Sequence, residues 1–336
     1  MENTRHKTAE FIEAAGGTTE HTDLIVEIIE TALRLARSPS DRGDLKILHT
    51  TLKEMRYAFQ LFGPYRNTRK VSVFGSARGV LPQAVYDQAS EFGQKIVAAG
   101  FMVITGAGDG IMRAVQHGAG RRNSFGINIL LPFEQEANEF IENDPKLATF
   151  KYFFTRKLFF LKEANAIALF PGGFGTHDEG FEALTLLQTG KSPPMPLVMI
   201  DAPDGHYWAR WQEYVQDELL ATKLISEEDM HLFRVVHRVD DAISEITRFY
   251  HNYHSLRFVG DRLVLRLQRP LSPTRLAALN DSFADIIERE QIVATPTLPA
   301  EANEPHLHDL PRIAFYFNKR NFGRLRQLID AINVDD

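Results

Sequence analysis

The sequence contains no cysteine. This absence excludes disulfide bonds, thiolate nucleophiles and cysteine-ligated zinc, and it suits a reducing compartment. Long apolar runs are missing too: the longest, such as 166–170, are far shorter than the roughly 20 residues that a membrane-spanning helix needs. Residues 1–16 carry Glu2, Glu10 and Glu13 and no apolar core, so they do not resemble a signal peptide. We therefore expect a soluble cytoplasmic protein with no membrane partner.

Positive charge is not in excess. The 38 Lys and Arg residues face 44 Asp and Glu residues, which gives a net charge of −6. Broad, sequence-independent binding to nucleic acid needs a basic surface, so we expect no nucleic-acid partner. The 336 residues are more than one average domain needs, and a 44% hydrophobic share is ordinary for a globular protein. We expect one large domain with smaller additions.

The first 68 residues have a helical pattern. Apolar residues recur at helical spacing in 23–35 and again in 44–62, and Gly63-Pro64 ends the second run. No catalytic pattern occurs in this part of the chain. We interpret residues 1–68 as a helical extension that covers another surface or mediates dimerisation.

Residues 69–250 alternate short apolar runs with amphipathic segments. Strands are expected at 71–74, 101–105, 126–131, 167–170 and 197–200. Helices are expected near 83–99, from about 110, near 156–164, at 176–188, after 207 and near 240–250. Regular alternation of strand and helix predicts a parallel sheet covered on both faces. This part is therefore predicted to be a Rossmann-like α/β domain.

Residues 251–336 are predicted to form a small α+β domain. The run 258–267 resembles a strand interrupted at Gly260-Asp261. Ser272-Pro273 is a typical N-cap and first-turn pair for a helix, which we expect to extend to residue 287. The proline-rich stretch 295–311 is expected to be a loop, and the chain is expected to end with a strand at 313–317 and a helix at 322–332.

Three glycine-rich segments each follow an expected strand. Their candidate ligand-binding residues are Gly75, Ser76, Gly106, Gly108, Gly110, Gly172, Gly173, Gly175 and Thr176. Loops at the carboxyl ends of parallel strands converge at one edge of the sheet, and glycine lets backbone N–H groups approach a phosphate. One such loop would be an ordinary tight turn, whereas three together predict a nucleotide or phosphate site. Ser76 could bind the ligand or cap its own turn.

Two common nucleotide-binding motifs are absent from these loops. None of them has the spacing G-x-G-x-x-G, so a dinucleotide fingerprint is missing. No G-x-x-x-x-G-K-[ST] occurs either, which argues against a P-loop NTPase. The chemistry must therefore come from the third loop and its flanks.

The third loop carries a family resemblance. Pro171-Gly172-Gly173-Phe174-Gly175-Thr176-His177-Asp178-Glu179 matches P-G-G-x-G-T-x-x-E and resembles the LOG ("Lonely Guy") phosphoribohydrolases, which are often mislabelled as lysine decarboxylases. Arg156-Lys157 resembles the Arg-Lys pair of that family, and 106–112 resembles its second glycine loop. The segments 126–129 and 131–135 are similar to a longer bacterial branch. The resemblance covers about residues 70–250.

The resemblance implies an activity and its residues. Arg156 and Glu179 would be the catalytic pair, and Gly172, Gly173, Gly175 and Thr176 would hold the 5′-phosphate. The substrate would be AMP or an N6-modified analogue such as a cytokinin riboside monophosphate, cleaved to free base and ribose 5-phosphate without a cofactor. A homodimer or a higher, even-numbered oligomer is also implied. Because molybdenum-cofactor carriers share a similar scaffold, a non-catalytic nucleotide or cofactor carrier is the alternative.

The chemistry of Glu179 and Arg156 supports the same interpretation independently of the family resemblance. Glu179 lies one helical turn after Thr176, so its carboxylate can face the loop mouth. There it could stabilise an oxocarbenium-like sugar, hold ribose hydroxyls or activate water. Arg156 offers a permanent cation that could orient Glu179 or bind substrate. The plainer alternatives are a helix-dipole role for Glu179 and a surface charge at Arg156.

Several residues near the third loop have more than one possible role. Lys157 is a candidate substrate-binding residue through its place in the Arg-Lys pair, and Glu182 could support the site or be solvated. His177 and Asp178 point different ways on a helix and lack metal-ligand spacing, so no metal site is expected. Four phenylalanines, Phe153, Phe154, Phe159 and Phe160, are expected in the core, although one could line a base pocket. A lysine decarboxylase is not expected, because no pyridoxal-phosphate site is recognisable.

Overall fold

The computed structural model describes the chain apart from residues 1, 18–20, 79–80, 132–135 and 335–336. It divides into two compact units, residues 1–56 and residues 57–336. Four residues of the 131–135 segment, 132–135, lie outside the described residues. The domain boundaries expected after residues 68 and 250 stay predictions.

The first unit is helical, as the apolar spacing predicted. It consists of α1 (Glu2–Ala14), α2 (Thr22–Leu35) and the first part of α3 (Arg42–Phe62). Helices α1 and α2 pack against each other, and Ile12 and Val26 are buried. No helix among the described residues has the length and apolar character needed to cross a membrane.

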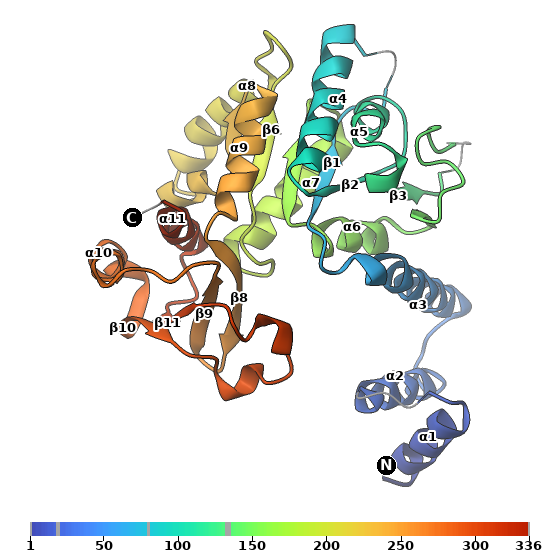
Figure 1. Cartoon of the computed structure of the whole chain (residues 1–336). Helices are drawn as coiled ribbons and strands as arrows, with labels where there is room; N and C mark the ends of the chain where they lie inside the picture. The colour runs from blue at the N-terminus through green and yellow to red at the C-terminus, as the bar shows by residue number, and fades with distance from the viewer. Residues whose placement is uncertain (1, 18–20, 79–80, 132–135, 335–336) are drawn as a thin grey trace. The chain divides into compact units, whose positions relative to one another are not determined.

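The second unit contains a seven-stranded sheet in the order β4-β3-β2-β1-β5-β6-β7, with all neighbours parallel (Figure 1). Its strands are β1 (Lys70–Phe74), β2 (Met102–Thr105), β3 (Ser124–Ile129), β4 (Leu147–Phe150), β5 (Ala166–Leu169), β6 (Leu197–Ile200) and β7 (Arg234–Val236). Strands β1, β2, β3, β5 and β6 are buried along their whole length, so their sequences are mostly apolar, and β5 and β6 are apolar throughout. The predicted Rossmann-like α/β fold is confirmed.

Helices cover both faces of this sheet. They are α4 (Gln83–Ala98), α5 (Ile111–Ala119), α6 (Phe153–Lys162), α7 (Phe174–Gln188), α8 (Tyr207–Tyr214) and α9 (Val239–Phe249). Alternation along β1 shows which helices share a face: Val71 and Val73 pack in one cluster with apolar residues of α4, α5 and α9. Ser72 and Phe74 point the other way, toward Phe160 of α6. Helix α6 therefore covers the face opposite to α4 and α5.

A second, antiparallel sheet lies in the C-terminal part in the order β10-β11-β9-β8. It is formed by β8 (Tyr253–Val259), β9 (Arg262–Leu267), β10 (Ile287–Thr295) and β11 (Arg312–Phe317), with α10 (Pro273–Ser282) and α11 (Phe322–Ile332). The single interrupted strand expected at 258–267 is instead a hairpin that turns at Gly260-Asp261. A small C-terminal α+β region was correctly predicted, but its strand content was underestimated.

The helix expected to extend to residue 287 ends at Ser282, so this prediction was wrong. A short 3-10 turn at Ala284–Ile286 follows, and strand β10 begins at Ile287. The Asn280 side chain accepts a hydrogen bond from Ile292 N (2.7 Å) and donates one to Ile292 O (2.9 Å). These two bonds fold β10 back against α10, a tertiary contact that local apolar spacing does not reveal.

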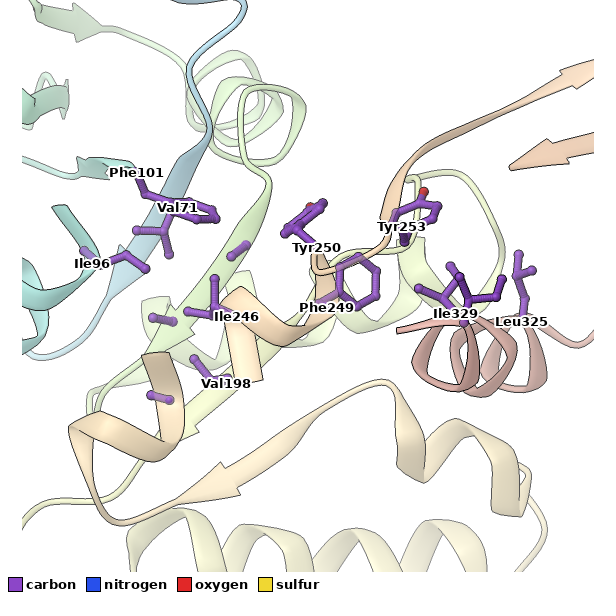
Figure 2. Packing of buried hydrophobic residues seen from close by; sticks show 14 of the residues in the cluster. Val71, Ile96, Phe101, Val198, Ile246, Phe249, Tyr250, Tyr253, Leu325 and Ile329 are labelled. Atoms are coloured by element: carbon purple, nitrogen blue, oxygen red, sulfur yellow. The ribbon is translucent and has the colours of Figure 1, made fainter. Parts of the chain in front are cut away.

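One continuous apolar core joins the two sheets (Figure 2). It extends from Val71 and Ile246 through Phe249, Tyr250 and Tyr253, near the end of α9, to Leu325 and Ile329 of α11. Phe249 and Tyr253 contact edge to face with ring centroids 5.3 Å apart. The chain between α9 and β8 is therefore a packed junction between the sheets.

Candidate functional site

The three glycine-rich loops meet where the strand order reverses. Strand β1 lies between β2 and β5, and the loops follow the carboxyl ends of these three strands. Ser76 N donates to Pro171 O (3.0 Å), and Ile111 N donates to Ser76 O (3.0 Å). Ligands of open α/β sheets bind at such a switch point, so the predicted convergence of the loops is confirmed.

The glycines in these loops have two different structural roles. A Cβ at Gly75 would lie 2.7 Å from the Ile111 side chain, and one at Gly110, where φ is +68°, would collide with the Ser76 carbonyl oxygen. Glycine at these two positions therefore lets the first and second loops pack closely against each other. A Cβ at Gly173 or Gly175 would meet nothing within 4 Å, so open space lies beside the backbone there. Gly173 and Gly175 are the positions at which a ligand can approach the main chain.

A cavity of about 320 Å³ opens over these loops. The predicted site residues that line it are Gly75, Ser76, Gly106, Arg156, Gly173, Gly175, Thr176 and Glu179. The predicted residues outside the lining are Gly108, Gly110, Gly172, Lys157 and Glu182. The lining residues without a predicted role include Arg78, Met112, Phe174 and Asp178. The volume lies at the lower end of the range for small-molecule pockets.

Some of the predicted residues outside the lining support the loops. The Gly108 carbonyl accepts from Asn138 Nδ2 (2.9 Å). Ser76 lines the cavity, and its Oγ accepts a hydrogen bond from Arg78 N (3.2 Å) within its own turn. The local turn and the cavity wall are thus built by the same side chain.

Arg156 enters the cavity from helix α6. Its Nε donates to Ile127 O (2.9 Å), and its guanidinium lies 5.0 Å from the Phe160 ring centroid. A Cβ at Gly106 would lie 2.5 Å from Arg156 Nη2, so glycine leaves room for the guanidinium. Burial lowers the pKa of Arg156 to about 10, and Glu179 opposes that shift. Arg156 therefore remains cationic at neutral pH, in a fixed orientation.

Glu179 lies on the cavity wall, one turn into α7, and is only 8% exposed. Its Oε2 is buried and has no hydrogen-bond partner among the described residues. Burial raises the pKa of Glu179 to about 7, although Lys157 and Arg156 act in the opposite direction. No ion pair within 4.0 Å joins Glu179 to either cation in the described part of the chain. An unpaired buried carboxyl group that titrates near neutrality is typical of functional sites.

Lys157 binds carboxylates of α7 and does not line the cavity. Its Nζ lies 2.6 Å from Asp178 Oδ2 and 2.7 Å from Glu182 Oε2. Burial acts to lower the pKa of Lys157, but the hydrogen bonds to Asp178 and Glu182 outweigh it and raise the pKa. These pairs tie α6 to α7 and so hold Arg156 and Glu179 on adjacent helices.

His177 and Tyr207 support the third loop, a role that the sequence did not predict. Tyr207 Oη donates to Gly172 O (2.5 Å) and lies 2.6 Å from His177 Nε2. Because a phenol has one hydrogen, His177 Nε2 is the donor in the second bond. Burial lowers the pKa of His177, which favours the neutral ring. Among the described residues, no group of three or more His, Asp or Glu side chains could hold a metal ion.

The phenylalanines of α6 divide into two pairs. Phe159 and Phe160 are fully buried, as predicted. Phe153 and Phe154 are 58% and 56% exposed, so the expectation that they lie in the core was wrong. Phe153 stands at the first turn of α6 and lines the cavity, as does Phe174, which is 96% exposed. Exposed rings beside a polar cavity are suited to stacking on a planar base.

A larger cavity, of about 610 Å³, lies elsewhere in residues 57–336. None of the glycine loops lines it, and neither Arg156 nor Glu179 reaches it. The smaller cavity is the better candidate for chemistry, because a buried unpaired carboxyl group, a fixed cation and open glycine backbone converge there.

One protein-family model matches part of the chain. Residues 109–246 match the model of a family described as "possible lysine decarboxylase". None of the curated proteins matches significantly.

Solved structures similar to this chain include the protein TM1055, at 21% identity and a TM-score of 0.37, covering 52% of this chain and 96% of that one. The molybdenum cofactor carrier protein from Chlamydomonas reinhardtii has 19% identity and a TM-score of 0.38, covering 53% and 94%. The molybdenum cofactor binding protein from Rippkaea orientalis has 17% identity and a TM-score of 0.35, covering 53% and 94%. The family resemblance predicted from the glycine-rich motif is confirmed for this part of the chain: residues 109–246 match the LOG-like family model that is described as a possible lysine decarboxylase.

Proposed function

We propose that this protein hydrolyses the N-glycosidic bond of a purine nucleoside 5′-monophosphate, either AMP or an N6-modified analogue. The observation that carries the proposal is the Glu179 carboxyl group, buried and unpaired on the wall of a cavity made by three glycine-rich loops. A carrier that only binds a ligand gains nothing from an unsatisfied carboxyl group at that place, because leaving it unpaired costs about 1–3 kcal/mol or more.

The phosphate would lie at the start of α7. The first N–H groups of a helix have no acceptor within the helix and carry the positive end of its dipole. Gly173 and Gly175 leave open space beside this backbone, and the Thr176 side chain lines the same wall. The exposed Arg78, from the first loop, lines the cavity as well and adds a cation. The ribose and base would then extend toward Glu179 and Phe153.

Glu179 and Arg156 would act on the glycosidic bond. As the bond between C1′ and the base nitrogen lengthens, positive charge develops on the sugar, and an ionised Glu179 stabilises it. The bonding electron pair leaves with the base, which takes up a proton, and water adds its oxygen to C1′ and releases a proton. A carboxyl group with a pKa of about 7 is suited to accepting that proton near neutral pH. Arg156, fixed by Ile127 O, would orient the substrate or the carboxylate.

The test is release of free base from a panel of nucleoside monophosphates. Glu179→Gln should lower kcat by about 100-fold or more, a loss of at least ~2.7 kcal/mol of barrier stabilisation, and change AMP affinity little. Arg156→Ala should also reduce turnover, and the double variant should be about as poor as the worse single variant if the two act together. Wild-type kcat/KM should rise with pH up to about 7 and then level off, because the ionised carboxylate is the active form.

Glu213→Gln is the matched control, because it makes the same change at an exposed glutamate of α8 that does not line the cavity. It should retain most of the activity. Wild-type protein that binds AMP and releases no base, with affinity unchanged by Glu179→Gln, would instead indicate a nucleotide carrier.

A further inference from the structure

The larger cavity lies between the parallel sheet's helices and the C-terminal sheet. Its volume is about 610 Å³. The last turns of α6 and α7 contribute Leu161 and Leu186, the loop after α7 contributes Lys191, and strand β8 contributes Tyr253 and Ser255. The walls thus come from three stretches of the chain, 158–165, 186–195 and 250–256, brought together by the junction shown in Figure 2.

One wall of this cavity is aromatic and rigid. Tyr250 and Tyr253 are both buried, with ring centroids 6.2 Å apart in a stacked arrangement. Tyr250 Oη donates to Asn165 O (2.6 Å), and the Arg69 guanidinium lies 3.9 Å from the Tyr250 ring centroid. Leucine side chains from α6 and α7 complete an apolar surface. Such a surface is suited to an apolar or planar molecule.

The charges around the cavity are mostly positive. Lys162 and Lys191 line it, and no Asp or Glu does so. The Lys191 ammonium group makes no ion pair with any described residue. Lys162 pairs with Glu163 at 2.5 Å, but Glu163 also lies 4.0 Å from the ammonium group of the buried Lys70. One carboxylate is thus shared by two lysines.

Arg69, behind the Tyr250 ring, adds another cation. Burial lowers the pKa of Arg69, and none of the influences on that pKa comes from a carboxylate. The cavity also contains His254, whose Nδ1 lies 2.9 Å from Ser255 Oγ. Burial lowers the pKa of His254, so at neutral pH it offers hydrogen bonds and not charge. The surroundings therefore carry an excess of positive charge that attracts anions.

We propose that this cavity binds a small organic anion with an aromatic or similarly apolar body. The anionic group would lie near Lys191 and Lys162, and the apolar body would pack on Tyr253, Leu161 and Leu186. Neither part of this surface is used by the proposed hydrolysis, so the site is separate from the catalytic cavity.

A ligand bound in this cavity would contact the two helices that carry Arg156 and Glu179. Leu161 lies on α6, five residues after Arg156, and Leu186 lies on α7, seven residues after Glu179. A ligand that contacts the ends of both helices would change how they pack and so alter the Arg156–Glu179 geometry. This regulatory consequence rests on the proposed function, whereas the binding site does not.

The absence of cysteine permits a site-specific test. Ser255→Cys introduces the only thiol into the chain, within the cavity, and its alkylation by N-ethylmaleimide can be followed by mass spectrometry. The probe is 1-naphthoate, with neutral 1-naphthalenemethanol as its comparison. Naphthoate should slow alkylation at least fivefold at saturation, and the neutral alcohol should require about tenfold higher concentrations for the same protection. Ser192→Cys, on the loop that forms another wall, provides a second reporter if Ser255→Cys unfolds.

Charge reversal identifies the anion-binding group. Lys191→Glu, introduced into the Ser255→Cys protein, should raise the naphthoate concentration needed for half-protection about tenfold or more. Lys223→Glu, which changes an exposed lysine outside the cavity lining, should leave that concentration unchanged. Absence of protection at both reporters, or equal effects of the two lysine variants, would overturn the proposal. Saturating naphthoate should also change kcat/KM for AMP; an unchanged value would overturn the regulatory consequence alone. Absence of base release would count against the proposed function and leave the alkylation result standing.

Discussion

Replacing Glu179 by glutamine should make the protein more stable at alkaline pH while making it a worse catalyst. Burial raises the pKa of Glu179 from 4.5 to about 7. A difference of about 2.5 units corresponds to roughly 3 kcal/mol between the ionised and neutral forms in the folded state. Glutamine resembles the neutral carboxylic acid in size and shape. Above pH 7 the variant therefore avoids the free-energy cost of holding an ionised carboxylate in a buried position.

The sign of the pH dependence follows from the direction of the shift. Between pH 4.5 and about 7 the folded protein binds more protons at Glu179 than the unfolded chain does, so stability falls as pH rises through that window. Above pH 7 the ionised, buried Glu179 lowers the free energy of unfolding by the full amount, and below pH 4.5 it has no such effect. The attraction of Glu179 to Arg156 and Lys157 is already contained in the shifted pKa. Loss of that attraction therefore needs no separate subtraction.

Urea denaturation at pH 4.5 and pH 8 measures this effect. The difference in unfolding free energy between Glu179→Gln and the wild type should be close to zero at pH 4.5 and about 3 kcal/mol in favour of the variant at pH 8. Glu213→Gln should show no such gain, because Glu213 is an exposed residue of α8 outside the cavity lining. A Glu179→Gln effect of the same size at both pH values would refute the reasoning.

Two further predictions concern the substrate and the assembly. AMP should be cleaved at least ~100-fold more efficiently than adenosine, because charge-assisted hydrogen bonds of about 1.5–3 kcal/mol each would hold the phosphate at the start of α7; comparable kcat/KM values would contradict the phosphate site. We also propose that the protein is a homodimer or a higher, even-numbered oligomer, because Phe154, Leu158 and Phe181 leave apolar surface exposed on α6 and α7. Light scattering that finds a 38.1 kDa particle at micromolar concentration would count against this.

The sequence predicts the parallel sheet well because its inner strands are buried on both faces. Runs such as 166–169 and 197–200 are short and apolar throughout, and amphipathic helices separate the strands along the chain. The two edge strands escaped prediction. Strand β7 has three residues and starts with an exposed arginine, and β4 has four residues with mixed exposure. Short, partly exposed strands carry too little apolar pattern to be recognised.

The site was partly predictable for a similar reason. The glycine loops follow recognisable strands, so their convergence at the edge of the sheet follows from topology alone. The contacts of Tyr207 with His177 and Gly172 join residues 30 and 35 positions apart, and no local spacing rule relates them. The exposed Phe153 was misjudged because an aromatic residue on a helix is usually buried. The sequence does not show that α6 begins at the mouth of the cavity.

The high pKa of Glu179 depends on how neighbouring charges are shared, which composition cannot reveal. Two cations, Arg156 and Lys157, lie near three carboxylates of α7. From the residue types alone, one would expect Glu179 to be paired with one of these cations and to have a low pKa. Lys157 instead binds Asp178 and Glu182, at 2.6 and 2.7 Å, and Arg156 Nε is held by a backbone carbonyl. Glu179 keeps only their longer-range attraction, which does not offset its burial. The pairing of Lys157 with the outer carboxylates therefore leaves the inner one free to titrate near neutrality, as the proposed chemistry requires.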